Sequence, residues 1–211
     1  MSQIKTAIIG GASPHLLLLP YDLWGLQADL VVGVNEYCLR ARCDWTVISD
    51  TYRLPQWAGW LEPRRQDGMK VAARRHNSLD EREMLIPNRC ADYWFPLIKK
   101  WVHYGERGMD GWGLDQGLSY VSTTATCAMD LAAKCGATTL ILAGVDLAGD
   151  YKADGTSYGQ ANFWGVHVDG VNGWLAEFQK RAKVTIYKTN ENSPLALPYK
   201  TVDEVTAILN E

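Results

Sequence analysis

Four small residues in a row, Gly10, Gly11, Ala12 and Ser13, follow the first apolar stretch of the chain. Small side chains let backbone amides approach a phosphate group closely. The spacing is not Gly-x-Gly-x-x-Gly, and no Gly-Lys-Ser or Gly-Lys-Thr occurs, so neither a dinucleotide fingerprint nor a P-loop is supported. The four residues fit either a loop that receives a nucleotide or similar anion, or a plain tight turn.

A second candidate anion site is the hydroxyl run Ser122, Thr123 and Thr124, which precedes a stretch rich in Ala, Met and Leu. The free amides and the dipole at a helix start favour negative charge, although ordinary helix capping explains the same residues. Asp146 follows another apolar run, where it suits either a ribose hydroxyl or the bracing of a loop.

Histidine is the usual general base near neutral pH, and the chain has four. His167 lies between the end of a predicted strand and the start of a predicted helix, a position that suits a catalytic base as well as it suits a structural role. His15 lies beside the small-residue loop, within reach of a bound phosphate.

The elements that would position these residues alternate along the chain. Uninterrupted apolar runs predict strands that are covered on both faces, and capping signals such as the Thr201–Glu204 capping box mark helices. Strands are predicted at 4–9, 29–34, 45–49, 138–143 and 184–187, helices at 125–134, 174–183 and 201–209, and a short helix or turn within 14–26. This alternation predicts a single α/β domain over 1–211, a Rossmann-like, doubly wound and mostly parallel sheet.

Ligands of doubly wound sheets bind beyond the carboxyl ends of the strands. Polar or small residues follow each predicted strand: Gly10 to Ser13, then Asn35, Asp50 and Asp146, and finally Asn190, Asn192 and Ser193. Their convergence predicts a nucleotide-binding crevice more strongly than any one motif does.

Residues 52–119 differ from the rest of the chain, because Pro, Gly and Trp are frequent there. This composition predicts an irregular insertion with a few short elements, either a lid over the pocket or a surface elaboration. Its basic residues suit either an anionic acceptor, such as a glycan or DNA, or a solvated face; they are Arg64, Arg65, Arg74 and Arg75.

Composition excludes several classes of protein. The net charge of −3 over 211 residues provides no strong basic field for nucleic acid. Five cysteines without a Cys-x-x-Cys pair argue against a disulfide framework and a structural zinc site, and favour a reducing cytoplasm. The apolar runs are too short for a membrane span, and no signal peptide is recognisable. The nine Trp fit core packing or stacking on a ring ligand.

In two blocks, roughly 5–51 and 120–198, the chain resembles the bacterial sialyltransferases typified by the Campylobacter lipooligosaccharide enzymes. The same resemblance extends to DUF115 and 6-hydroxymethylpterin diphosphokinase-like proteins, which include many phage proteins. The family opens on Gly-x-Gly-Pro-Ser, where this chain has Gly10-Gly11-Ala12-Ser13-Pro14. Gly11 therefore stands where the sialyltransferases have an Asn that meets the phosphate, while Asn35 matches the family's Asn after strand two.

The later matches to the family are shorter. Asp50 stands for the Asn after strand three, and Thr123-Thr124 for a Thr-Ser pair that opens the next helix. Val121 replaces an Arg just before that pair. Gly144-Val145-Asp146 resembles the family's Gly-Ile-Asp stretch, and Tyr158 resembles its nucleotide-contacting Tyr. His167, which lies ten residues before Glu177, matches the family's catalytic His in spacing.

The resemblance implies a metal-independent glycosyltransferase that needs no cofactor and moves a sugar from a nucleotide-activated donor to an acceptor hydroxyl. His167 would deprotonate the acceptor, and Thr123, Thr124 and the amides of the 10–13 loop would hold the leaving phosphate. The formation of a homo-oligomer is left open by the sequence. Two alternatives also stay open: a pterin diphosphokinase-like enzyme that uses ATP and Mg²⁺ on Asp44, Asp50, Asp146 and Asp150, and a non-catalytic nucleotide-binding phage protein.

Overall fold

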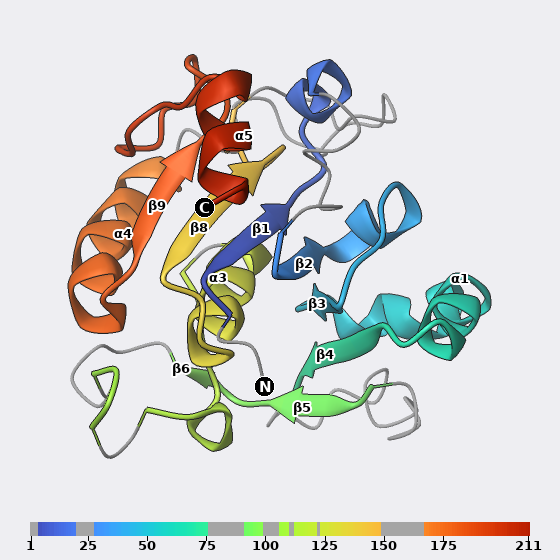
Figure 1. Ribbon diagram of the computed structural model, residues 1–211. Helices are drawn as coiled ribbons and strands as arrows, with labels where there is room; N and C mark the ends of the chain where they lie inside the picture. Colours follow the sequence, from blue (N-terminus) through green and yellow to red (C-terminus); the bar gives the residue numbers. More distant parts are fainter. Residues whose placement is uncertain are drawn as a thin grey trace.

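A seven-stranded parallel sheet forms the centre of the molecule in the computed structural model (Figure 1). The structure describes residues 4–19, 28–75, 91–98, 106–109, 112–121, 123–148 and 167–211. The strand order is β5-β4-β3-β2-β1-β8-β9, and every neighbouring pair is parallel. The strands are β1 (Thr6–Gly10), β2 (Leu30–Val34), β3 (Trp45–Ile48), β4 (Lys70–Arg74), β5 (Tyr93–Phe95), β8 (Thr139–Ala143) and β9 (Thr185–Lys188). This arrangement confirms the predicted α/β fold class.

The order of the strands reverses at β1. The chain builds the sheet outward from β1 to β5 and then returns to add β8 and β9 on the other side of β1. The connections that follow β1 and β8 therefore lead to opposite faces of the sheet, and this topological switch point is where doubly wound sheets bind ligands. Outside the sheet, β6 (Leu97–Ile98) and β7 (Leu118–Ser119) form a small parallel pair.

Helices cover both faces of the sheet, because each strand turns alternate apolar side chains to opposite sides. Helices α3 (Thr124–Lys134) and α4 (Val168–Ala182) pack on the face that carries Ile9, Val47 and Ala72. Helices α1 (Leu54–Gln66) and α5 (Val202–Leu209) pack on the face that carries Ile8, Ile48 and Ala73. Figure 1 shows α5 in front of the sheet and α3 behind it.

Local signals placed most helix ends correctly. The Thr201 side chain accepts from the Glu204 amide, and the Glu204 carboxylate accepts from the Thr201 amide, which confirms the capping box. Helix α4 begins at Val168, six residues before the predicted start. Val171, Trp174 and Phe178 continue one buried face back toward that start, at the three- and four-residue spacing of a helix. Short 3₁₀ helices are η1 (Pro14–Leu18), η3 (Asn35–Leu39), η4 (Thr51–Arg53) and η7 (Leu114–Gln116).

The prediction of an irregular insertion over 52–119 was wrong for much of that segment. Helix α1 crosses over the sheet from β3 to β4, and β4 and β5 extend the main sheet at one edge. Pro55 suits the first turn of α1, where no amide partner is lost, so proline was a misleading sign of irregularity. The buried run of β4 is short and contains two alanines, which have low strand propensity. The predicted role of the segment as a lid stays a prediction.

Within the described ranges, no helix is both long and apolar enough to span a membrane.

Candidate functional site

The loops after β1 and β8 meet at the switch point. The Ser13 hydroxyl donates to the Asp146 carboxylate. The Gly11 amide donates to the Ala143 carbonyl at 2.8 Å, and the Ser13 amide to the Gly144 carbonyl at 2.9 Å. Two amides of the predicted phosphate loop are therefore used inside the protein. Only the Ala12 amide, which donates to none of the described residues, stays available for the predicted phosphate contact.

The close approach of these loops requires glycine on both sides. A Cβ at Gly11 would collide with the Gly144 carbonyl and lie 2.7 Å from the Val145 side chain. Gly144 itself has φ +69°, a conformation that disfavours other residues. The position that resembles the family's phosphate-contacting Asn therefore has no room for a side chain.

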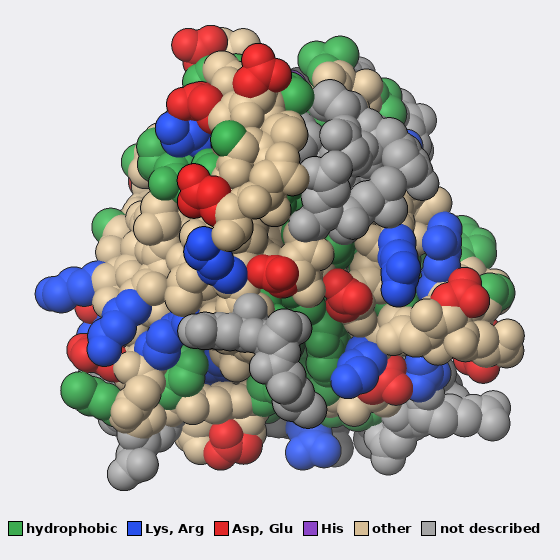
Figure 2. Space-filling view, viewed as in Figure 1, with side chains coloured by type: hydrophobic (Ala, Val, Ile, Leu, Met, Phe, Trp, Pro, Cys, Tyr) green, Lys and Arg blue, Asp and Glu red, His purple; other side chains and the backbone are tan. Residues whose placement is uncertain are grey.

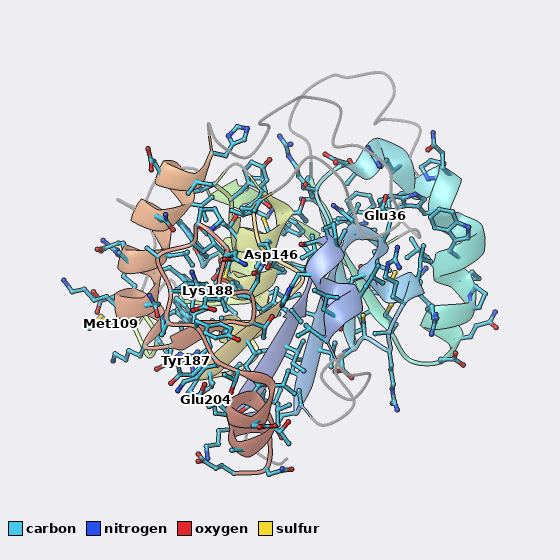
Figure 3. The ribbon with its side chains drawn as sticks, turned by 90° about the horizontal axis from the view of Figure 1, so that it is seen from above. Glu36, Met109, Asp146, Tyr187, Lys188 and Glu204 are labelled. Atoms are coloured by element: carbon cyan, nitrogen blue, oxygen red, sulfur yellow. The ribbon has the colours of Figure 1, made fainter. Side chains whose placement is uncertain are left out.

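Asp146 is buried and lies at a junction of three loops. It accepts from Ser13, and its own carbonyl accepts from the Ser193 hydroxyl at 2.7 Å, in the loop after β9. Figure 3, which views the molecule from above, places Asp146 between α4 and η1. These contacts favour the interpretation in which Asp146 braces loops. His15 contributes to the same bracing, because its Nε2 lies 2.8 Å from the Thr189 carbonyl.

Asn35, directly after β2, carries a buried amide oxygen without a partner. Its Oδ1 accepts no hydrogen bond from the described residues, whereas its backbone carbonyl accepts from the Thr46 hydroxyl at 3.2 Å. The residue has φ +52°, in the left-handed region that asparagine tolerates. Because an unpaired buried amide oxygen costs free energy, it is a ready acceptor for a ligand hydroxyl or amino group.

The start of α3 combines capping with a contact to β3. Thr123 is the N-cap and accepts from the Ala125 amide at 3.3 Å, so ordinary capping accounts for its hydroxyl. The Thr124 hydroxyl forms a hydrogen bond with the Ser49 hydroxyl, at the end of β3. The first turn of α3 is thereby fixed against the carboxyl edge of the sheet, with its positive dipole end facing that edge.

Asp50, directly after β3, acts electrostatically on Tyr120, which precedes α3. Burial, above all, raises the pKa of the Tyr120 hydroxyl, and the charge on Asp50 raises it further, whereas Arg74 lowers it. The Asp50 side chain makes no capping bond to η4, the short helix that begins after it. Asp50 therefore lies at the predicted edge, near the start of α3.

His167 is half-buried and directly precedes α4. In a parallel sheet a crossover helix runs antiparallel to the strands, so the α4 start lies at the carboxyl edge with the other candidates. A Cβ at Gly170 would lie 3.7 Å from the Val121 side chain, which places the first turn of α4 beside the segment that directly precedes α3. The Asn172 side chain binds the Pro194 carbonyl and the Ala196 amide, joining α4 to the loop after β9.

The four arginines proposed for an anionic acceptor do not form one patch. Arg64 and Arg65 end α1, at the amino edge of β4, and Arg65 pairs with Asp92 at 2.9 Å. Arg74 and Arg75 lie at the opposite, carboxyl end of β4. Figure 2 shows Lys and Arg interspersed with Asp and Glu over the visible face, with no single basic field.

The carboxylate set of the diphosphokinase alternative does not assemble. Asp44 precedes β3 and accepts from the Val31 amide at the amino edge, whereas Asp50 and Asp146 follow strands at the carboxyl edge. In the described part of the chain, no three His, Cys, Asp or Glu side chains cluster as metal ligands. Asp150, Ser122 and the predicted nucleotide-contacting Tyr158 lie outside the described residues.

Sequence reasoning missed three residues of this edge: Ser49, Tyr120 and Ser193 as a partner of Asp146. Ser49 ends an apolar run, and that position alone could have indicated it. Tyr120 and the pairing of Ser193 with Asp146 depend on contacts between distant segments, for which the sequence carries no local signal.

With this geometry established, the chain can be compared with known proteins. No family model matches it, and no curated protein matches it in sequence. Solved structures match it over nearly its whole length. The chain has a sialyltransferase-like fold. The sialyltransferase CstII from Campylobacter jejuni, solved with cytidine-5′-monophosphate, has a TM-score of 0.54 and 14% identity, over 96% of this chain and 87% of that one.

Two further structures agree in fold. The α-2,3-sialyltransferase Cst-I from Campylobacter jejuni has a TM-score of 0.60 and 15% identity, over 95% of this chain and 82% of that one. The MAf glycosyltransferase from Magnetospirillum magneticum has a TM-score of 0.51 and 14% identity, over 99% of this chain but 37% of that one. The predicted resemblance is confirmed for the fold. The structural matches cover 95% or more of this chain, so they extend beyond the two blocks, 5–51 and 120–198, to which the sequence limited the resemblance.

Proposed function

We propose that this protein is a metal-independent glycosyltransferase that moves a sugar from a nucleotide-activated donor to an acceptor hydroxyl. The observation that carries the proposal is the unpartnered Asn35 amide oxygen at the carboxyl edge, beside a topological switch point. A buried acceptor without a partner there favours a ligand with hydroxyl or amino groups. The fold shared with sialyltransferases, one of them solved with cytidine-5′-monophosphate, supports a nucleotide as that ligand.

The donor would lie across the carboxyl edge. The Asn35 Oδ1 atom would accept from a ribose hydroxyl or a base amino group. The Thr124 amide, at the start of α3, would face the phosphate, whereas the Ala125 and Thr126 amides donate to Thr123. Asn35, Asp50, Thr123 and Thr124 are thus proposed contacts; Gly10, Gly11, Ser13, Gly144 and Asp146 would shape and brace the floor.

His167 would act as the general base. The acceptor oxygen attacks the anomeric carbon of the sugar while its proton passes to the imidazole. The bond between that carbon and the phosphate oxygen breaks, and the nucleotide leaves with the electron pair. The first turn of α4 lies against Val121, three residues before α3, so a base at the α4 start would be near a phosphate at the α3 start.

The acceptor and the location are finer parts of the proposal. A related sialyltransferase was solved with a trisaccharide acceptor and CMP, which supports a glycan acceptor over DNA. Five cysteines without a Cys-x-x-Cys pair support the cytoplasm as its location.

The first experiment is a thermal-shift screen with CMP, CDP, UDP, GDP and ATP, each with Mg²⁺ and with EDTA. A ligand that binds only the folded state raises the Tm by mass action. We expect a Tm increase with a nucleoside mono- or diphosphate that EDTA leaves unchanged. A response limited to ATP with Mg²⁺ would favour the diphosphokinase alternative instead, and no response to any nucleotide would refute the donor site.

Catalysis is tested by His167→Ala, with the exposed Lys180→Ala on the same helix as the control. Loss of a general base lowers rates by about 10²–10⁴-fold. We expect that loss of sugar transfer in His167→Ala, with nucleotide binding retained, and normal transfer in Lys180→Ala. Nucleotide binding by wild type without transfer to any glycan would support the non-catalytic alternative.

A further inference from the structure

We propose that Arg74 binds the phosphate of the nucleotide at the start of α3 and stabilises its charge as it leaves. The inference rests on the proposed function only in naming a nucleotide as the source of the phosphate. An anion site at Arg74 follows from the direction, register, missing partners and electrostatic surroundings of its side chain.

Arg74 points to the α3 side of the sheet. Side chains alternate along β4: Val71 and Ala73 pack on the face of α1, and Ala72 packs on the face of α3. Arg74, two residues beyond Ala72, therefore turns to α3. The effect of its charge on Tyr120 and on Cys127, in the first turn of α3, agrees with this direction.

The register places Arg74 next to the start of α3. Ile48 of β3 pairs with Ala73, so Ser49 and Arg74 are the next residues of the two strands. Ser49 forms its hydrogen bond with Thr124, the first residue of α3. On the other side, Arg74 pairs with Phe95 of β5. The guanidinium thus extends from the carboxyl edge beside the first turn of the helix.

The Arg74 side chain has no hydrogen-bond or ion-pair partner among the described residues. Its Nε atom is buried and makes no hydrogen bond, and in the described part of the chain no carboxylate lies within ion-pair distance of it. Arg107 also has a buried Nε without a partner, but its terminal nitrogens donate to carbonyls at the C-terminal end of α3, including Ala133 at 2.8 Å. A charge that is partly buried and unpaired costs free energy.

The electrostatics at the two ends of α3 are opposite. Arg107 caps the carboxyl end, where the helix dipole is negative and favours a cation. Arg74 lies at the amino end, where the dipole is positive and repels it. A guanidinium and a helix N-terminus that face the same point attract an anion jointly, and a phosphate matches both in geometry.

The site also limits which anion fits. Asp50 and Arg74 both affect the pKa of the Tyr120 hydroxyl, in opposite directions. The negative charge of Asp50 is therefore near the site and repels a bound anion. A nucleotide phosphate can accept from the Thr124 amide and from Arg74 together. A carboxylate on the transferred sugar is also an anion and would fit the same site. The experiment therefore tests the nucleotide phosphate and the sugar carboxylate separately.

The test compares wild type with Arg74→Gln, Arg74→Lys and the exposed neighbour Arg75→Gln. The probes, read by calorimetry, are pyrophosphate, the four common nucleoside 5′-monophosphates, their uncharged nucleosides and free sialic acid. We expect Arg74→Gln to weaken nucleotide and pyrophosphate binding at least tenfold while nucleoside binding stays unchanged. Arg74→Lys retains part of the affinity, and Arg75→Gln binds as wild type does.

A second readout shows whether Arg74→Gln folds and whether the charge is strained. Removing an unpaired, partly buried charge should leave the ligand-free Tm unchanged or raise it by about 2–4 °C. A large fall in that Tm, or equal losses for nucleotide and nucleoside, would make Arg74 a structural residue and overturn the inference.

The outcomes also separate this inference from the proposed function. Pyrophosphate binding that requires Arg74, without any sugar transfer, would support the anion site while the glycosyltransferase proposal fails. Nucleotide binding and transfer that are unaffected in Arg74→Gln would overturn the inference while the proposed function stands. Sialic acid binding that depends on Arg74 while nucleotide binding does not would assign the site to a sugar carboxylate, and wild type that binds no anion would refute it.

Discussion

The hydroxyl of Ser13 donates to the carboxylate of Asp146, a residue 133 positions later in the chain. This bond joins the loop after β1 to the loop after β8 across the point where the strand order reverses. Ser193, after β9, donates to the Asp146 carbonyl and brings in a third loop. The floor of the candidate site is thus braced by the protein before any ligand binds, which is the preorganisation that precise ligand placement needs.

Breaking this bond should cost stability. Asp146→Ala leaves the buried Ser13 hydroxyl without its acceptor, and we expect a loss of about 1–3 kcal/mol in the free energy of unfolding. Urea denaturation measures it, with the exposed Glu191→Ala as a control that should stay within about 0.5 kcal/mol of wild type. The double variant with Ser13→Ala should lose less than the sum of the single losses; strict additivity would mean that the two side chains do not interact.

Gly11 should tolerate no side chain. Gly11→Ala places a Cβ against the Gly144 carbonyl, and overpacking of this kind costs about 1–3 kcal/mol of stability. Gly59→Ala is the matched control, because a Cβ at Gly59 in α1 meets no atom within 4 Å. Helix propensity should make that control more stable by about 0.5–1 kcal/mol. A Gly11→Ala protein that melts with wild type would contradict the close approach of the two loops.

Asn35 should matter for ligand binding more than for folding. Asn35→Gly removes the unpartnered amide and keeps a residue that accepts φ +52°. Loss of one hydrogen bond to the ligand corresponds to a dissociation constant about tenfold higher. Titration calorimetry with the nucleotide found in the screen measures it, and Asn210→Gly, an exposed position on the last helix, should change nothing. Equal affinity in both variants would remove Asn35 from the site.

The buried pair Asp130 and Lys134 predicts a pH dependence. Burial, the largest cause, raises the pKa of Asp130 to about 6, and burial lowers the pKa of Lys134. Between pH 4 and 6 the folded state then binds more protons at Asp130 than the unfolded state does. Stability from this group is therefore present at low pH and is lost as the pH rises toward 6, with a slope of at most about 1.4 kcal/mol per pH unit.

The measurement compares wild type and Asp130→Asn by urea denaturation at several pH values. The Asn variant retains the shape of the side chain and cannot titrate. The difference in stability between the two proteins should shift in favour of Asn as the pH rises from 4 to 6. A difference that is flat with pH would show that Asp130 titrates alike in both states.

The five strands predicted from sequence all exist, and four of them are apolar runs that are buried on both faces; the fifth, β9, is an edge strand that buries only Ile186. The same rule failed for β4 and β5. Strand β4 buries only three residues and β5 buries only one. The prolines near these strands suggested an irregular segment instead. Both strands are stabilised by pairing at the edge of a sheet, a contact that is distant in sequence and leaves little periodicity.

For the site, the sequence by itself determined which residues follow the strands, since a parallel sheet sends every carboxyl end to one edge. It also determined that α3 and α5 begin at Thr caps, because capping is local. Only the tertiary structure decided that Asp146 braces Ser13, that Gly11 has no room for a side chain, and that Arg74 turns toward the start of α3. Those features depend on strand order and register, which follow from packing between segments far apart in the chain.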